Sequence, residues 1–156
     1  MLKEALRAVA NKCSEFAQGE LMDEGSVGQA VIGIDENGKA TPVQVGPEMT
    51  QNDVAGLMRD MAQTCMGIVM IVEGVFADVK KDAQGNLPEL PADFKELPDA
   101  TSAIFCLAYS KEGAEIRRLA YSRNKDTGKY TFYDMGWDDK QISNDCRFAN
   151  PFNGRK

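Results

Sequence analysis

The sequence contains no histidine among its 156 residues, and this absence removes several kinds of catalytic site. Histidine is the side chain that titrates near neutral pH and the commonest metal ligand in proteins. Without it, Ser-His and Cys-His nucleophilic catalysis and histidine-ligated zinc are excluded. Glycine-rich phosphate loops and the Gly-x-Ser-x-Gly elbow are missing as well. These absences favour a protein that acts by binding over an enzyme.

The cysteines are too far apart in the sequence to form a paired metal or redox motif. No two of them lie within four residues of each other, so the C-x-x-C spacing does not occur; they are Cys13, Cys65, Cys106 and Cys146. The first three fall in apolar patterns, as buried reduced thiols do. The aspartates within 134–145 lack the D-x-D-x-D-G spacing of a calcium loop. We therefore expect no metal and no cofactor.

Long apolar segments are also missing. The longest apolar run, residues 67–72, is far shorter than the about 20 residues that span a bilayer. The N-terminal segment MLKEALRAVANKCSEFAQ carries charges throughout and has no apolar core of a secretion signal. These features predict a cytoplasmic protein that does not insert into a membrane.

Charge is plentiful but unevenly distributed. Residues 1–100 carry 8 basic and 17 acidic side chains, a balance of −9, whereas residues 101–156 carry 10 and 7, a balance of +3. A net charge of −6 opposes general nucleic-acid binding, because affinity for phosphate depends on lysine and arginine. The polarity suits docking onto a basic protein surface, and solubility alone is the other reading.

Apolar periodicity predicts two helices. The first spans residues 2–18 and is closed by Gly19, because apolar residues recur at steps of three and four. Its apolar residues are Leu2, Leu6, Val9, Ala10, Cys13, Phe16 and Ala17. The second begins after Thr50, whose hydroxyl caps the first turn together with Asp53.

Strands account for most of the remaining chain. The segment AVIGIDENGKATPVQV predicts a hairpin with a type I′ turn at Asn37-Gly38, and Pro42 marks its second strand as an edge. A central strand over 67–79 is apolar on both faces. Residues 82–101 hold three prolines and form a long loop. Further strands follow at 102–110, 114–123 and 129–135.

These elements predict one domain, residues 1–156, with an α+β fold. The expected architecture has two layers, a mostly antiparallel sheet of about five to six strands with two helices on one face. A chain of this length buries roughly two thirds of its unfolded surface, which is enough for a stable core.

Glu73 interrupts the central strand and is the one weak candidate for a catalytic acid. By strict alternation it shares a face with Ile71 and Val75, where a lone carboxylate costs several kcal/mol unless it is paired. Three other readings stay open. Glu73-Gly74 can form a bulge, the strand can end there, or Arg117 or Arg118 can pair with the carboxylate.

Basic and aromatic side chains alternate along the hairpin at 114–129. The candidate binding residues are Arg117, Arg118, Tyr121, Arg123 and Tyr130. Arginine and tyrosine are enriched at protein interfaces, so we interpret them as a docking surface. The same pattern is typical of the solvated face of an antiparallel sheet. Single-stranded nucleic acid is disfavoured by the acidic remainder of the chain.

Residues 67–123 resemble part of a group of small phage and bacterial proteins. Those proteins have a strand that ends in Ser-Glu-Ala-Trp, followed by a similar loop and hairpin. Here the strand ends in Val72-Glu73-Gly74-Val75, so Glu73 is the matching residue, and the hairpin is SAIFCLAYSKEGAEIRRLAYSR. The group has no assigned activity, so the resemblance implies a phage-type setting and no mechanism. The order of elements is also similar to roadblock-type dimerisation modules, which implies a homodimer by fold analogy.

The leading hypothesis is a small acidic cytoplasmic protein that binds another protein, as an inhibitor or adaptor. It would use either its acidic N-terminal two thirds or the Arg/Tyr hairpin. The alternative is a ligand-binding or enzymatic domain, with a pocket formed by Glu73 and Arg117 or Arg118.

Overall fold

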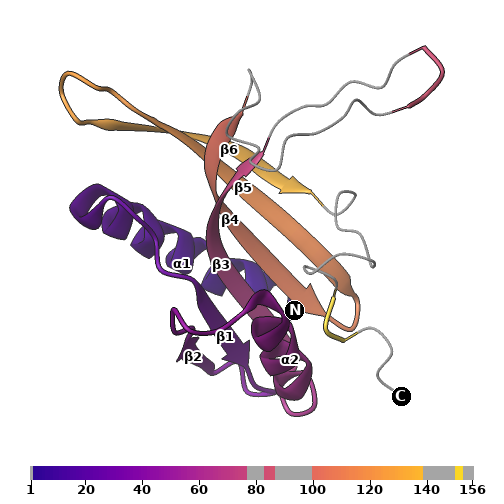
Figure 1. Ribbon diagram of the computed structural model, residues 1–156. Coiled ribbons are helices and arrows are strands. Elements are labelled where there is room, and N and C mark those ends of the chain that lie inside the picture. The colour runs from indigo at the N-terminus through magenta and orange to yellow at the C-terminus, as the bar shows by residue number, and fades with distance from the viewer. Residues whose placement is uncertain (1, 77–82, 87–99, 139–149, 153–156) are drawn as a thin grey trace.

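The computed structural model describes residues 2–76, 83–86, 100–138 and 150–152 (Figure 1). The helices in this part are α1 (Leu2–Glu24) and α2 (Gln51–Met61). The strands are β1 (Ala30–Ile34), β2 (Ala40–Gln44), β3 (Gly67–Phe76), β4 (Thr101–Ser110), β5 (Gly113–Arg123) and β6 (Tyr130–Asp138). Several predictions lie outside the described residues: most of the loop at 82–101, the end of the strand at 67–79, Asp139, Asp145 and Cys146.

The strands form one open six-stranded sheet in the order β2-β1-β3-β4-β5-β6. Every neighbouring pair is antiparallel. The predicted α+β class and mostly antiparallel sheet are therefore confirmed. Strand β2 is an edge, as Pro42 predicts, and β3 lies inside the sheet between β1 and β4.

The β1–β2 hairpin is confirmed, but its turn differs from the predicted type I′ turn. Only Gly38 has a positive φ, of 81°, whereas type I′ requires one at Asn37 as well. The N–H of Gly38 donates to the carbonyl of Asp35, and the N–H of Asp35 donates to the carbonyl of Lys39. The Asp35 side chain accepts from the N–H groups of Asn37 and Lys39, both at 2.9 Å. A longer loop held by Asp35 thus replaces the tight turn.

The two helices lie on opposite faces of the sheet, which corrects the prediction of one face (Figure 1). On β3, Val69 and Ile71 pack in a cluster with α1, while Ile68 and Met70 pack in a cluster with α2. Successive side chains of a strand point to opposite faces, so a strand that is apolar on both faces needs cover on both.

Both helices have clear end signals. For α2 the capping box is confirmed: Thr50 Oγ1 accepts the N–H of Asp53 at 3.1 Å, and Asp53 accepts the N–H of Thr50 at 2.9 Å. Helix α1 continues past Gly19, because Leu21 is buried against the sheet, and ends before Gly25, where φ is 79°.

Among the described residues, no helix has the length and apolar character needed to cross a membrane.

Helix α1 covers only the middle of its face of the sheet, where it packs on β3 and β4. Leu6 approaches the backbone so closely there that a Cβ on Gly67 would meet its Cδ2 at 2.5 Å. Six strands are about 24 Å wide at about 4.8 Å per spacing, whereas a helix with its side chains is about 10 Å across. One helix therefore leaves both flanks of this face without helical cover.

The flank over β5 and β6 is filled by the sheet's own large side chains. Tyr121, Tyr130, Phe132 and Trp137 all pack against the cluster of buried residues between α1 and the sheet, which we call the α1 core. Arg7 of α1 forms a two-point ion pair with Glu115, at 2.9 and 3.0 Å, which ties the helix to β5. The opposite flank, over β1 and β2, is the hollow side of the molecule.

Candidate functional site

Glu73 lies half-buried on the α1 face of β3 and holds a loop. Its Oε1 accepts a hydrogen bond from the backbone N–H of Val27 at 3.0 Å. The bulge reading of Glu73-Gly74 is wrong, because the β3–β4 register continues without a break through both residues. Gly74 is required by the ring of Phe105, which a Cβ at position 74 would meet at 2.9 Å. Glu73 therefore binds a backbone amide instead of an arginine.

A second carboxylate holds the same loop. Glu20 of α1 accepts the backbone N–H of Gly28 through Oε1 at 2.5 Å. The segment between α1 and β1 is thus fastened by one glutamate from the helix and one from the sheet. Because backbone N–H groups need acceptors when they leave regular structure, this arrangement explains both glutamates without invoking catalysis.

Tyr121 lies beside Glu73 on the same face. Burial, together with the charge of Glu73 and a hydrogen bond to its carboxylate, raises the pKa of the Tyr121 phenol to about 12. A tyrosine with this pKa keeps its proton at neutral pH, so it donates to Glu73 and does not act as a base.

Arg117 and Arg118 point to opposite faces of β5, so the structure does not bring them together. Arg117 donates to both carboxylate oxygens of Asp134, at 3.1 and 2.6 Å, and to Asn11 Oδ1 at 2.7 Å. Arg118 lies over the ring of Phe76, 5.8 Å from its centre, on the α2 face. The pairing of Glu73 with either arginine, one of the readings left open by the sequence, is therefore wrong.

Three of the five predicted binding residues do share a surface. Tyr121 and Tyr130 meet edge to face with ring centres 6.0 Å apart, and Arg123 lies 5.8 Å from the ring centre of Tyr130. Phe132 completes the cluster, 6.3 Å from Tyr121. This aromatic cluster, Tyr121, Arg123, Tyr130 and Phe132, lies on the β5–β6 side of α1.

A groove between α1 and the β1–β2 hairpin is a site that the sequence did not suggest. Its first hollow has a volume of about 290 Å³ and is lined mainly by apolar side chains. The lining residues are Lys12, Cys13, Phe16, Ala17, Glu20, Val27, Gly28, Ala30, Ile32, Pro42 and Ile71. A second, wider hollow shares Phe16, Glu20 and Pro42 and continues along β2 to Gln44. We call the two together the α1–β2 groove.

Phe16 stands at the rim of this groove with 75% of its surface exposed. The sequence placed Phe16 in the apolar stripe of the first helix, and that interpretation is wrong. The neighbouring positions four residues away, Lys12 and Glu20, are both charged, and this signal could have placed Phe16 on the flank of the helix.

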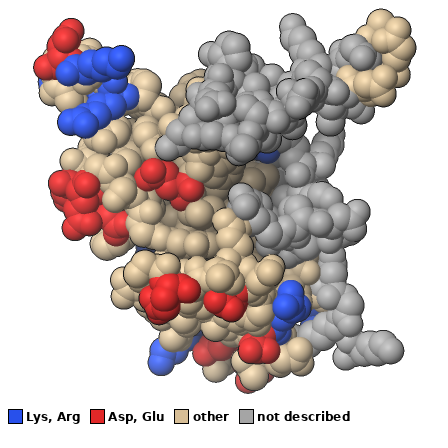
Figure 2. All heavy atoms as spheres, in the orientation of Figure 1, with Lys and Arg blue, Asp and Glu red and all other residues tan. Residues whose placement is uncertain are grey.

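The α1–β2 groove is acidic at the end where α1 terminates. Glu20 and Glu24 line it, Asp23 is exposed on the same turn, and the last turn of α1 has no basic residue. The carbonyl end of a helix carries about half a negative charge, so these carboxylates add to the helix dipole instead of offsetting it. Figure 2 shows acidic side chains gathered at this end of α1, at the left of the view. Lys12 lies at the other end of the groove.

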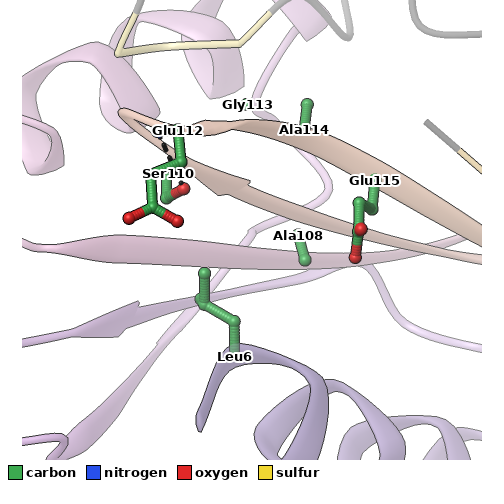
Figure 3. Close-up of a pocket in the computed structure, with 7 residues that line it drawn as sticks. All are labelled: Leu6, Ala108, Ser110, Glu112, Gly113, Ala114 and Glu115. Atoms are coloured by element: carbon green, nitrogen blue, oxygen red, sulfur yellow. Dashed lines mark hydrogen bonds between the residues drawn. The ribbon is translucent and has the colours of Figure 1, made fainter. Parts of the chain in front are cut away.

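A smaller pocket of about 240 Å³ lies between the N-terminal part of α1 and the β4–β5 turn (Figure 3). Two of its polar side chains have partners: Glu115 binds Arg7, and Ser110 Oγ accepts the N–H of Glu112 at 3.1 Å. Leu6 and Ala108 form its apolar side.

In the part of the chain that the structure describes, no group of three or more cysteine, aspartate or glutamate side chains is placed to hold a metal ion. Cys13, Cys65 and Cys106 carry free thiols. Burial raises the pKa of Cys106 to about 12, and its Sγ lies 3.6 Å from the carbonyl oxygen of Ala10. A thiol with this pKa stays protonated and is a poor nucleophile at neutral pH.

No protein-family model, no curated protein and no solved structure matches this chain.

Proposed function

We propose that this protein acts by binding another protein, as an inhibitor or adaptor, with the α1–β2 groove as its docking surface. One observation carries the proposal: Phe16 is 75% exposed beside an apolar hollow of about 290 Å³. Aromatic residues are enriched where proteins bind partners, and their burial supplies much of the affinity. An aromatic ring left mostly in water adds little to the stability of a monomer. The exposed ring therefore favours a role in recognition.

The contacts of the side chains in the alternative site, Glu73 and Arg117, also favour a role in recognition. Glu73 accepts a backbone N–H, and Arg117 is engaged by Asp134 and Asn11. These side chains hold secondary structure elements together, so no observation favours a catalytic or ligand-binding pocket made from them.

The aromatic cluster is the second contact surface of the proposal. Arg123 is exposed and rests on Tyr130, an arrangement common at interfaces that recognise proteins. Of the residues predicted to bind, Tyr121, Arg123 and Tyr130 remain in the proposal, while Arg117 and Arg118 are assigned to structural contacts.

A phage-type, cytoplasmic setting is part of the proposal. The resemblance of residues 67–123 to small phage and bacterial proteins supports the phage-type setting. The free thiols of Cys13, Cys65 and Cys106 support the cytoplasmic setting, because thiols persist in reducing compartments.

Affinity capture with two matched variants tests the docking surface. Phe16→Glu places a charge at the rim of the α1–β2 groove. Met22→Glu places the same charge on α1 at a residue that is 56% exposed and does not line the groove, so it is the control. Tagged wild-type protein and both variants, each checked for folding by thermal denaturation, are incubated with lysate of the organism that encodes the chain. Bound proteins are quantified by mass spectrometry and rebound in purified form.

We expect at least one protein to bind Met22→Glu at least as well as the wild type and to be lost from Phe16→Glu. Equal binding to all three would remove the groove from the proposal. A wild-type protein that retains no partner would contradict the proposed function itself.

A further inference from the structure

The α1–β2 groove has a chemical polarity that indicates what it binds, and this inference rests on the proposed function. We propose that the groove takes a linear segment of a partner protein in which a large apolar side chain has lysine or arginine next to it on one side. Two features of the groove lead to this occupant: an apolar hollow next to Phe16 and an unbalanced acidic end.

The hollow next to Phe16 suits an apolar side chain. Its floor is formed by Ile32 and Ile71, which belong to the α1 core, and its far wall by Pro42 of the edge strand. The floor is open because α1 packs mainly on β3 and β4, toward the middle of the sheet. A partner side chain placed here extends the existing core and covers Phe16, which removes apolar surface from water.

The acidic end of the groove calls for positive charge in the partner. Asp23 and Glu24 are exposed, and neither has an ion-pair partner within the described residues. Helix C-termini are normally offset by lysine or arginine, and none is present in the last turn of α1. A helix end whose negative charge is not offset within the protein is typical of a functional surface. A basic residue supplied by the partner offsets both the carboxylates and the helix dipole.

The groove sets the spacing and the manner of binding. Lys12 lies at one end and Glu24 at the other, so the basic residues of the segment lie on one side of its apolar anchor. Addition of a strand to the β2 edge is disfavoured, because Pro42 has no N–H to donate. The segment is therefore held by its side chains.

A second copy of this chain is a less suitable occupant. The basic residues Arg123, Lys125 and Lys129 belong to the β5–β6 hairpin, whose strands are separated from β1 by β3 and β4, so they form a different surface from the groove. Pairing of two different surfaces of the same protein is heterologous, and it leads to rings or open filaments instead of a closed dimer. The charge pattern thus favours a separate partner.

Selection from a random peptide library tests the inference and does not require the partner to be identified. Phage-displayed dodecapeptides are selected on the wild-type protein with an excess of Phe16→Glu in solution, which removes peptides that bind elsewhere. Enriched peptides are synthesised with a fluorescent label, and their affinities are measured by anisotropy at about 50 and about 250 mM salt. Each peptide is also made with its basic residues replaced by glutamate.

We expect enriched peptides to contain a large apolar residue next to lysine or arginine. Phe16→Glu should weaken their binding roughly tenfold or more, whereas Met22→Glu should not weaken it, because its added carboxylate lies outside the groove and beside Asp23 at the acidic end. Glutamate replacement should abolish binding, and higher salt should weaken it several-fold, because exposed charges are screened.

Three results would overturn the inference. Enrichment of peptides with no basic bias contradicts the role of the acidic end. Absence of groove-dependent peptides, while a folded partner is still lost from Phe16→Glu in affinity capture, rejects the linear segment and leaves the proposed function standing. Concentration-dependent assembly in light scattering that Phe16→Glu abolishes identifies a second copy as the occupant.

Discussion

Replacing Glu73 with alanine measures how much its carboxylate contributes to holding the loop between α1 and β1. The substitution removes the hydrogen bond to the N–H of Val27, 3.0 Å long, and the interaction with the Tyr121 phenol. Hydrogen bonds to charged groups contribute about 1.5–3 kcal/mol each, and Glu73 is only half-buried, so water replaces part of what is lost. We expect a loss of about 2 kcal/mol in the free energy of unfolding.

Urea unfolding at neutral pH is the assay, with Glu73→Gln as the matched control. The amide oxygen of glutamine still accepts the N–H of Val27, so its cost should be about 1 kcal/mol or less. With a slope of about 2 kcal/mol per molar urea, alanine should lower the midpoint by about 1 M and glutamine by less than half of that.

The tyrosine titration supplies an independent readout of the same site. Tyr121 has a pKa of about 12 against an ordinary value of 10.0, so the folded state holds the phenolic proton more tightly than the unfolded state. This contribution to stability is complete below pH 10 and is lost as the pH rises to about 12. Glu73→Gln should lower the Tyr121 pKa in an ultraviolet titration, with Tyr121→Phe to assign the signal.

Three outcomes would refute this reasoning. If alanine leaves the urea midpoint unchanged, Glu73 does not fasten the loop. If Glu73→Gln destabilises as much as alanine, charge and not hydrogen bonding is the main contribution. A Tyr121 titration unaffected by Glu73→Gln would show that burial alone raises its pKa.

Three further predictions test the placement of α1 and β6 and the state of the core thiol. Gly67→Ala should lower the free energy of unfolding by about 1–3 kcal/mol in a urea experiment, because its Cβ would meet Leu6 Cδ2 at 2.5 Å. The double variant Gly67→Ala with Leu6→Ala should lose less stability than the sum of the two single variants, because the smaller side chain relieves the contact. Arg117 lowers the pKa of Asp134 below its ordinary value of 3.8. The ion pair therefore stabilises the fold above pH 3.8, and this stabilisation is lost as acid protonates Asp134. Arg117→Met should reduce the dependence of the unfolding free energy on pH in this acidic range, measured by urea denaturation. Brief iodoacetamide treatment of the native protein, followed by peptide mapping, should leave Cys106 unmodified, because it is 1% exposed and its pKa is about 12.

Local chemistry determined the start of α2 and the existence of the β1–β2 hairpin, and both were predictable from the sequence. Thr50 and Asp53 are three residues apart, so the capping box forms from neighbours in the chain. The hairpin likewise follows from alternating apolar residues around Gly38. The antiparallel sheet and the α+β class follow from the order of such segments.

Where local signals competed with burial, burial prevailed. Gly19 was the expected end of α1, yet the helix continues because Leu21 is 1% exposed and packs into the core. Propensity differences amount to about 1 kcal/mol per residue, and a buried leucine contributes about 1.5–3 kcal/mol. Both apolar faces of β3 were visible in the sequence, but the assignment of one helix to each face required the packing itself.

The partners of the candidate site residues were decided only by the tertiary structure. Glu73 binds Val27, which is 46 residues away, and Arg117 binds Asn11, which is 106 residues away. The α1–β2 groove exists because one helix about 10 Å across cannot cover a six-stranded sheet about 24 Å wide. The sequence determined which residues are apolar and which are charged. The three-dimensional arrangement of helix and sheet decided that Phe16 stays exposed.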